Sequence, residues 1–181
     1  MNKKISEVPK KVENFLEKLS VKFEAVRHKT VFTAYDKAAT LRVKPSTIAK
    51  VLVVKLDKEL AMAVISGGKN LDTDKLLKLA KAKKIDLAKE KVIGEIFKGI
   101  DPGAIPPFYG LWQIKVFCDK KLLEQPKIIL SAGSYEASLE MSPSTFKKAN
   151  PEMIIGNFSK TKEKKPKLKK SAKSNSLKKS K

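Results

Sequence analysis

One lysine stands at the start of an apolar run and is the residue of this chain best placed to do chemistry. Lys50 follows S-T-I-A and precedes V-L-V-V-K-L, a stretch rich in β-branched residues that predicts a buried strand. A lysine in that position has to reach solvent along its aliphatic stem, pair with a carboxylate, or point into a pocket. We favour the pocket as a hypothesis. A lysine that simply reaches solvent is the commoner arrangement, and this stretch alone leaves it open.

Two stretches of glycine, proline and small residues could supply main-chain groups to such a pocket. Residues 99–110 read G-I-D-P-G-A-I-P-P-F-Y-G, which is too apolar for an ordinary surface loop and too broken for a helix or strand. A fixed loop of this kind suits a wall that selects small ligands by shape, and the alternative is a rigid connector packed on the core. The second stretch is S-A-G-S at residues 131–134, where we expect a turn after a strand that lets a ligand approach the backbone.

The single histidine and the single cysteine exclude several kinds of site. Cys118 has no second cysteine to pair with, which is consistent with a reducing compartment, and His28 alone cannot complete a Cys/His metal cluster. Cys118 falls in an apolar stretch and is expected in the core. No cysteine or serine motif accompanies His28, so we expect it to form structural hydrogen bonds rather than to catalyse. No serine or cysteine has a recognisable base partner, which argues against an acyl-enzyme, and phosphate-loop, dinucleotide, hydrolase-elbow and zinc-protease motifs are missing from the sequence.

The charge of the chain indicates a polyanionic partner, and nucleic acid is the commonest one. Forty Lys and Arg residues against 19 Asp and Glu residues give a net charge of +21. Residues 160–181 hold eleven lysines and one glutamate, so the rest of the chain is also basic. This end of the chain cannot bury enough apolar surface to fold, and its composition fits either a nuclear-import patch or the tail of an RNA-binding protein. No apolar run approaches the roughly 20 residues of a membrane helix, so we expect a soluble, cytoplasmic protein without a membrane partner.

Hydrophobic periodicity predicts a mixture of hairpins and helices that would position these residues. We therefore expect an α/β fold, with a mixed central sheet and helices packed around it. The expected helices span residues 9–19, 33–41, 46–49, 72–83, 93–97, 119–124 and 143–149. The expected strands span residues 23–27, 51–56, 60–66, 112–118, 127–130, 137–141 and 153–155, with a short strand or loop at residues 87–92. The lysine face of the helix at residues 72–83 is either a solvated face or an RNA contact.

The lysine at the start of the strand, the G-A-I-P-P loop and the S-A-G-S turn occur in an order that resembles the YbaK/ProX family of aminoacyl-tRNA editing domains. The resemblance covers about residues 28–153. It implies a mostly antiparallel sheet surrounded by helices, and hydrolysis of the ester that joins a wrong amino acid to tRNA, most often alanine or cysteine on proline tRNA. It implies no cofactor and no metal. Mischarged tRNA is the implied partner, together with prolyl-tRNA synthetase.

The same resemblance assigns roles to individual residues. Lys50 would be the catalytic residue. The substrate-binding residues would come from the loop, from the turn and from the single histidine: Gly103, Ala104, Ile105, Pro106, Pro107, Ser131, Ala132, Gly133, Ser134 and His28. Some members of the family carry a lysine or histidine directly after the glycine that corresponds to Gly133. Here Ser134 and Tyr135 follow, so the resemblance leaves the amino acid open.

These expectations divide the chain into an editing domain at residues 1–158 and a disordered lysine-rich tail at residues 159–181. The expected function is that of an aminoacyl-tRNA deacylase that acts as a stand-alone trans-editing factor, with water or a group of the substrate as nucleophile. Two alternatives remain at this point. One is a non-catalytic RNA-binding module on the same fold, and the other is a structural or interaction protein whose tail targets nucleic acid or an acidic partner.

Overall fold

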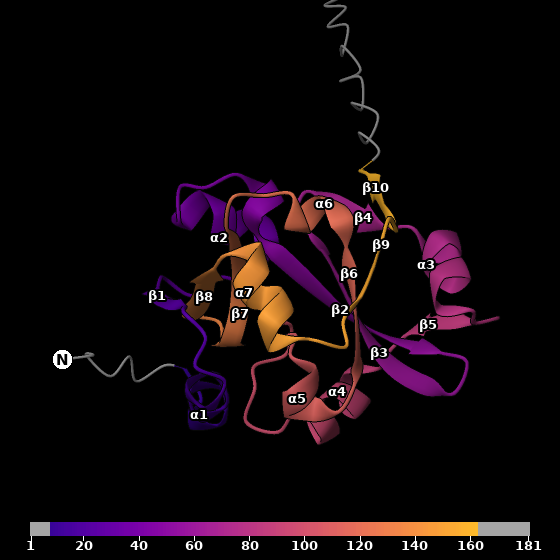
Figure 1. The fold of residues 1–181 in the computed structure, drawn as a ribbon, viewed down its shortest axis with the longest axis horizontal. Coiled ribbons are helices and arrows are strands. Elements are labelled where there is room, and N and C mark those ends of the chain that lie inside the picture. Colours follow the sequence, from indigo (N-terminus) through magenta and orange to yellow (C-terminus); the bar gives the residue numbers. More distant parts are fainter. Residues whose placement is uncertain (1–7, 163–181) are drawn as a thin grey trace, which may run out of the picture.

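A five-stranded sheet lies at the centre of residues 8–162, the part of the chain that the structure, a computed structural model, describes (Figure 1). Its strand order is β5-β2-β3-β6-β9. β2 pairs antiparallel with both β3 and β5, whereas β6 runs parallel to β3 and β9 runs parallel to β6. The strands are β2 (Ala49–Leu56), β3 (Glu59–Ser66), β5 (Ile85–Leu87), β6 (Lys115–Asp119) and β9 (Ile154–Gly156).

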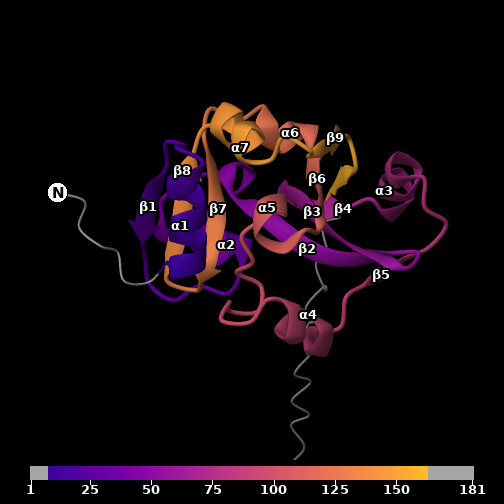
Figure 2. The same cartoon turned by 60° about the horizontal axis from the view of Figure 1, so that its bottom comes forward.

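A three-stranded antiparallel sheet stands beside the large sheet in both views of the fold (Figures 1 and 2). Its order is β1-β8-β7, formed by β1 (Glu24–Arg27), β8 (Ala137–Met141) and β7 (Ile128–Ser134). One isolated parallel bridge, between Ile48 and Ile129, connects the start of β2 to β7. A two-stranded ribbon pairs β4 (Lys69–Leu71) with β10 (Ser159–Thr161). The mixed, mostly antiparallel arrangement confirms the expected fold class.

Helices pack around these sheets, and most of them begin where the sequence predicted. Thr33, Asp72 and Ser142 each accept a hydrogen bond from a backbone N–H in the first turn of the helix that follows, which satisfies donors that a helix start leaves unpaired. The helices are α1 (Lys10–Lys18), α2 (Ala34–Thr40), α3 (Thr73–Ala80), α4 (Glu90–Ile96), α5 (Tyr109–Trp112), α6 (Lys120–Leu123) and α7 (Pro143–Ala149), with a 3-10 turn at Pro45–Thr47. None of the helices in residues 8–162 has the length and apolar character needed to cross a membrane.

The two faces of β2 belong to two different cores. Val53, together with residues of β3, β6, β7, β8 and α1, lies in the main core, which fills the space between the two sheets. Val54 and Leu56 point to the other face and pack with Leu76 of α3 and with Phe158. This alternation is what the period of two along a strand requires when both faces of a sheet are covered.

Several local expectations differ from the structure, and four of them concern the site or the ends of elements. Residues 131–134 form the end of β7, where the pairing with β8 shifts register, instead of a turn that follows the strand. Of the strand expected at residues 112–118, residues 115–118 are extended, whereas Trp112 belongs to the helical turn α5. The helix predicted for residues 72–83 ends at Ala80, because Lys81 adopts a left-handed conformation. Residues 159–161, which fall within the expected tail, form β10, and residues 163–181 lie outside the described part of the chain.

Gly133 is held in a backbone conformation and a space that suit only glycine, which gives a test of the fold. Its φ is +104°, and an added Cβ would lie 2.8 Å from Ile100 Cδ1 and 2.9 Å from Pro9 Cγ. We expect Gly133→Ala to lower the free energy of unfolding by about 1–3 kcal/mol, measured by urea denaturation. Gly94→Ala in α4 is the control, since an added Cβ there meets nothing within 4 Å. It should raise stability by about 0.5–1 kcal/mol. An unchanged Gly133→Ala variant would contradict this packing.

Candidate functional site

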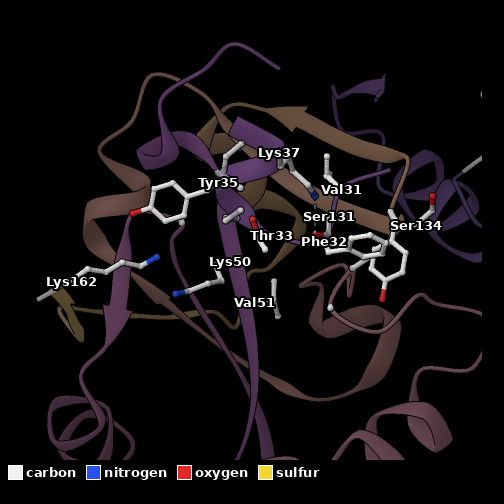
Figure 3. Close-up of a pocket in the computed structure, with 17 residues that line it drawn as sticks. Val31, Phe32, Thr33, Tyr35, Lys37, Lys50, Val51, Ser131, Ser134 and Lys162 are labelled. Atoms are coloured by element: carbon white, nitrogen blue, oxygen red, sulfur yellow. Dashed lines mark hydrogen bonds between the residues drawn. The ribbon is translucent and has the colours of Figure 1, made fainter. Parts of the chain in front are cut away.

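A pocket of about 310 Å³ opens where the two sheets meet (Figure 3). The start of β2, the start of α2 with the segment before it, the end of β7 and the loop at Gly103 contribute its walls. The lining contains three lysines and no carboxylate among the residues that the structure describes. The lining residues are Val31, Phe32, Thr33, Ala34, Tyr35, Lys37, Ile48, Ala49, Lys50, Val51, Gly67, Gly103, Ala104, Ser131, Ser134, Tyr135 and Lys162.

Lys50 lies half-buried in this pocket at the second residue of β2. Its Nζ donates a hydrogen bond of 2.7 Å to the backbone carbonyl oxygen of Lys69 in β4, which fixes the direction of the side chain. Burial lowers the pKa of Lys50, and the nearby charge of Lys162 lowers it further. An ammonium group has three N–H donors, so with one of them used Lys50 can still offer hydrogen bonds to an anionic ligand.

The proline-rich loop contributes both a wall and a packed connector. Gly103 and Ala104 line the pocket, whereas Ile105, Pro106 and Pro107 are buried away from it. The loop is anchored at both of its ends by side chains. At one end, Asp101 accepts from the backbone N–H of Tyr135 at 2.9 Å, and the Tyr135 hydroxyl donates to the carbonyl of Pro102. At the other end, Trp112 Nε1 donates to the carbonyl of Pro106 at 3.1 Å, and Asn150 Nδ2 donates to that of Pro107 at 3.2 Å. The sequence left two interpretations of this loop open, and each applies to one part of it. Residues 103–104 form a wall of the pocket, and residues 105–107 form a connector packed on the core.

The S-A-G-S residues are also divided, because the register of the strand shifts between Ser131 and Ser134. Ser131 and Ser134 line the pocket. Ala132 points into the main core, and the α-carbon of Gly133 faces Ile100 and Pro9. His28 does not line the pocket, and its Nε2 lies 2.8 Å from the hydroxyl of Ser138 on β8.

Lys37 is the residue that the sequence analysis missed. It lies in α2, its exposed fraction is only 7%, and its Nζ donates to Ser131 Oγ at 3.3 Å. Burial lowers the pKa of Lys37 from its ordinary 10.5 to about 8. In this contact the amine donates and the serine hydroxyl accepts, so the pair does not by itself supply a base to Ser131. The two residues are 94 positions apart, so nothing local in the sequence connects them. A lysine beside the small residues Ala38 and Ala39, on a helix expected to pack closely on a sheet, was the one available signal.

Aromatic rings and a third lysine form the mouth of the pocket. Phe32 and Tyr135 make an edge-to-face contact with ring centroids 4.8 Å apart. Lys162, the residue directly after β10, places its Nζ 4.1 Å from the centroid of the Tyr35 ring. Figure 3 shows the amines of Lys50 and Lys162 on one side of the pocket and Lys37 with Ser131 on the other.

Cys118 contributes no nucleophile to this site. It is fully buried in the main core, as the sequence predicted, and burial raises the pKa of its thiol to about 12. A thiol that stays protonated in an apolar strand is inert. Within residues 8–162, no group of His, Cys, Asp and Glu side chains is arranged to hold a metal ion.

Comparison with known sequences identifies the family. The aminoacyl-tRNA editing domain family matches residues 28–149, which is more than half of the chain, and the protein therefore belongs to that family. This confirms the resemblance carried by the three motifs. The chain is also 29% identical over 107 residues, or 59% of its length, to a proline–tRNA ligase of Desulforamulus reducens. It spans only 18% of the length of that ligase.

Solved structures share the same fold. The hypothetical protein APE2540 superposes with a TM-score of 0.75 at 26% identity, over 83% of this chain and 99% of the other. A protein described as a candidate trans-editing enzyme for prolyl tRNA synthetase superposes with a TM-score of 0.71 at 20% identity, over 83% of this chain and 96% of the other. At that identity the second likeness shows the fold alone.

The lowered pKa of Lys37 predicts a pH-dependent stability. Because the unfolded chain binds this proton more tightly, the stability penalty is fully present below about pH 8 and is lost as the pH rises towards 10.5. Relative to Lys37→Met, which has no such group, the parental protein should gain roughly 2 kcal/mol between pH 7.5 and pH 10. Denaturant titrations of both proteins at the two pH values measure the difference, and a difference that stays constant would show that Lys37 is not buried as described.

Proposed function

We propose that this protein hydrolyses the ester between an amino acid and the 3′ end of tRNA. The carbonyl carbon gains an oxygen from water, its bond to the ribose oxygen breaks, and the ribose oxygen takes up a proton. The observation that carries the proposal is Lys50, held by the Lys69 carbonyl inside a pocket whose described lining has three amines and no carboxylate. Membership of the aminoacyl-tRNA editing domain family supports it.

Lys50 orients the substrate and stabilises negative charge. Its remaining N–H donors are directed at the phosphodiester of the terminal nucleotide and at the charge that develops on the carbonyl oxygen. An aminoacyl ester is already activated, so positioning and electrostatic stabilisation supply most of what this reaction needs. Because Lys50 is half-buried, its interaction with an anion is stronger than at an exposed site, since the local dielectric constant is lower than that of water.

We further propose that the substrate is proline tRNA charged with alanine or cysteine, and that the protein acts in trans beside prolyl-tRNA synthetase. The similarity to a proline–tRNA ligase supports the choice of tRNA. One solved structure with the same fold is described as a candidate trans-editing enzyme for prolyl tRNA synthetase, which agrees with this proposal. Short side chains such as Val31, Ala34 and Ala104 line the pocket, and such a lining suits a small amino acid.

Replacement of Lys50 tests the role of the amine. Lys50→Ala should lower the rate of deacylation of Ala-tRNA(Pro) or Cys-tRNA(Pro) by about 100-fold or more, because it removes the positioned charge. Lys55→Ala is the matched control, since Lys55 lies on the same strand but is exposed and does not line the pocket. Release of the labelled amino acid gives the rate. A Lys50→Ala protein as active as the Lys55→Ala protein would exclude this role. A parental protein that binds tRNA but does not release the amino acid would indicate an RNA-binding module instead.

Lys162 should contribute to binding of the tRNA end rather than to the rate of hydrolysis at saturation. Lys162→Ala is expected to raise KM about 3- to 10-fold at low salt and to reduce the salt dependence of binding by about one counterion, because each lysine at a phosphate releases roughly one ion. Lys160→Ala on the adjacent strand β10 controls for net charge, since Lys160 does not line the pocket. Equal salt slopes for the two variants would show that Lys162 acts only through the general charge.

A further inference from the structure

The short strand β10 lies beside β4, the strand whose backbone holds Lys50 (Figure 1). Lys50 Nζ donates its 2.7 Å hydrogen bond to the carbonyl oxygen of Lys69, the first residue of β4. Among the described strands, β4 pairs with β10 alone. The match to the aminoacyl-tRNA editing domain family ends at residue 149, so β10 lies beyond the matched region. The hydrogen-bond partner of Lys50 therefore depends on a segment that the family match does not include.

The hydrogen-bond pattern of this ribbon leaves the Lys69 carbonyl available to Lys50. The backbone N–H of Asp72 donates to the carbonyl of Phe158 at 2.8 Å, and two residues further along the register places Lys160 opposite Asn70. Opposite residues in an antiparallel pair alternate between hydrogen-bonded and non-hydrogen-bonded pairs. Asn70 and Lys160 therefore exchange backbone hydrogen bonds, whereas the N–H and C=O of Lys69 face away from β10. Pairing with β10 fixes the direction of β4 without occupying the carbonyl that binds the amine.

Both ends of β10 are anchored. Before the strand, Phe158 is fully buried in the core that includes Leu76 of α3, and its backbone N–H donates to the buried carboxylate of Asp119 at 2.8 Å. At the end of the strand, Lys69 Nζ donates to Thr161 Oγ1 at 3.1 Å, which adds a side-chain contact across the ribbon. A two-stranded ribbon is only marginally stable alone, so these anchors keep the Lys69 carbonyl in place.

We propose that β10 is a positioning element for the catalytic amine: by pairing with β4 it holds the Lys69 carbonyl where that carbonyl directs Lys50 into the pocket. The proposal rests on the proposed function, in which Lys50 acts on the ester. The lysine side chain is flexible, and a single acceptor that is held firmly selects one of its directions. Misplacement of an orienting group by about 1 Å can cost about 100-fold in rate. Release of β10 should therefore lower turnover, although none of its three residues lines the pocket.

Two substitutions at one position separate the backbone of β10 from its charge. Lys160→Pro removes the N–H that pairs with Asn70, whereas Lys160→Ala keeps this N–H and removes the same charge. In the full-length protein at saturating Ala-tRNA(Pro), Lys160→Pro should lower kcat about 10- to 100-fold, and Lys160→Ala should keep the parental kcat. In a Lys50→Ala background, Lys160→Pro should cause no further loss, because both changes act through the same amine. Loss of Lys162 alone is expected to change KM, so a fall in kcat reports on Lys50.

Two results of these kinetics would overturn the proposal. One is a folded Lys160→Pro protein with the kcat of Lys160→Ala. The other is an equal further loss in the Lys50→Ala background, which would show an effect on the fold instead of on the amine. Circular dichroism and urea denaturation establish folding. If Lys160→Pro does not fold, Thr161→Gly takes its place in the same comparisons, since it removes the hydroxyl partner of Lys69 and weakens the end of the strand.

A measurement by NMR tests the hydrogen bond without tRNA. In ¹H–¹⁵N spectra of the lysine ammonium groups, the parental protein and Lys160→Ala should show a separate Lys50 signal, identified by its absence in Lys50→Ala, because the bond to the Lys69 carbonyl slows proton exchange with water. Lys160→Pro should lose this signal. A signal that persists in Lys160→Pro, or none in the parental protein, would overturn the positioning role. The expected spectra from a protein that hydrolyses no aminoacyl-tRNA would keep that role and refute the proposed function, so the two failures are distinguishable.

Discussion

The single bridge between Ile48 and Ile129 brings together the two strands that carry Lys50 and Ser131. It is the backbone contact by which the start of β2 meets β7, and the two strands then turn to different partners, β2 to β3 and β7 to β8. Lys50 and Ser131 each lie two residues beyond the bridge, so each projects to the same side of its strand as the bridged isoleucine. The pocket opens where the strands separate, and Ala38 of α2 packs on both isoleucines, which carries Lys37 to the same place.

Positive charge without a counter-charge is the second feature that shapes the site. Three amines line one pocket, and their partners are the main-chain carbonyl of Lys69, the hydroxyl of Ser131 and the ring of Tyr35. The described lining contains no carboxylate. Such an arrangement lowers stability, because burying an ammonium is unfavourable unless it is paired. The cost is offset when an anion enters or when an amine gives up its proton. Lys50 and Lys162 lie on one side of the pocket, and Lys37 lies on the other.

Local patterns in the sequence were enough to predict most of the framework. The hairpin of β2 and β3, the capped helices at Thr33 and Ser142, and the buried Cys118 each depend on neighbours in the chain, and all agree with the structure. What could not be predicted depends on distant partners. β4 and β10 are three-residue strands with little apolar character that exist because they pair with each other. The contact between Lys37 and Ser131 depends on the packing of α2 against β7, which no local pattern in the sequence reveals. Ala132 and Gly133 do not line the pocket, because β7 continues through them as a strand.

The central claim is that this pocket cleaves an aminoacyl ester and discriminates by the amino acid attached. Single-turnover deacylation of Ala-tRNA(Pro) and Pro-tRNA(Pro), with the full-length protein in excess and spontaneous hydrolysis subtracted, tests it most directly. The account predicts that the alanyl ester is hydrolysed at least about tenfold faster than the prolyl ester, a ratio that one or two well-placed contacts supply. Loss of both esters at the spontaneous rate would contradict it.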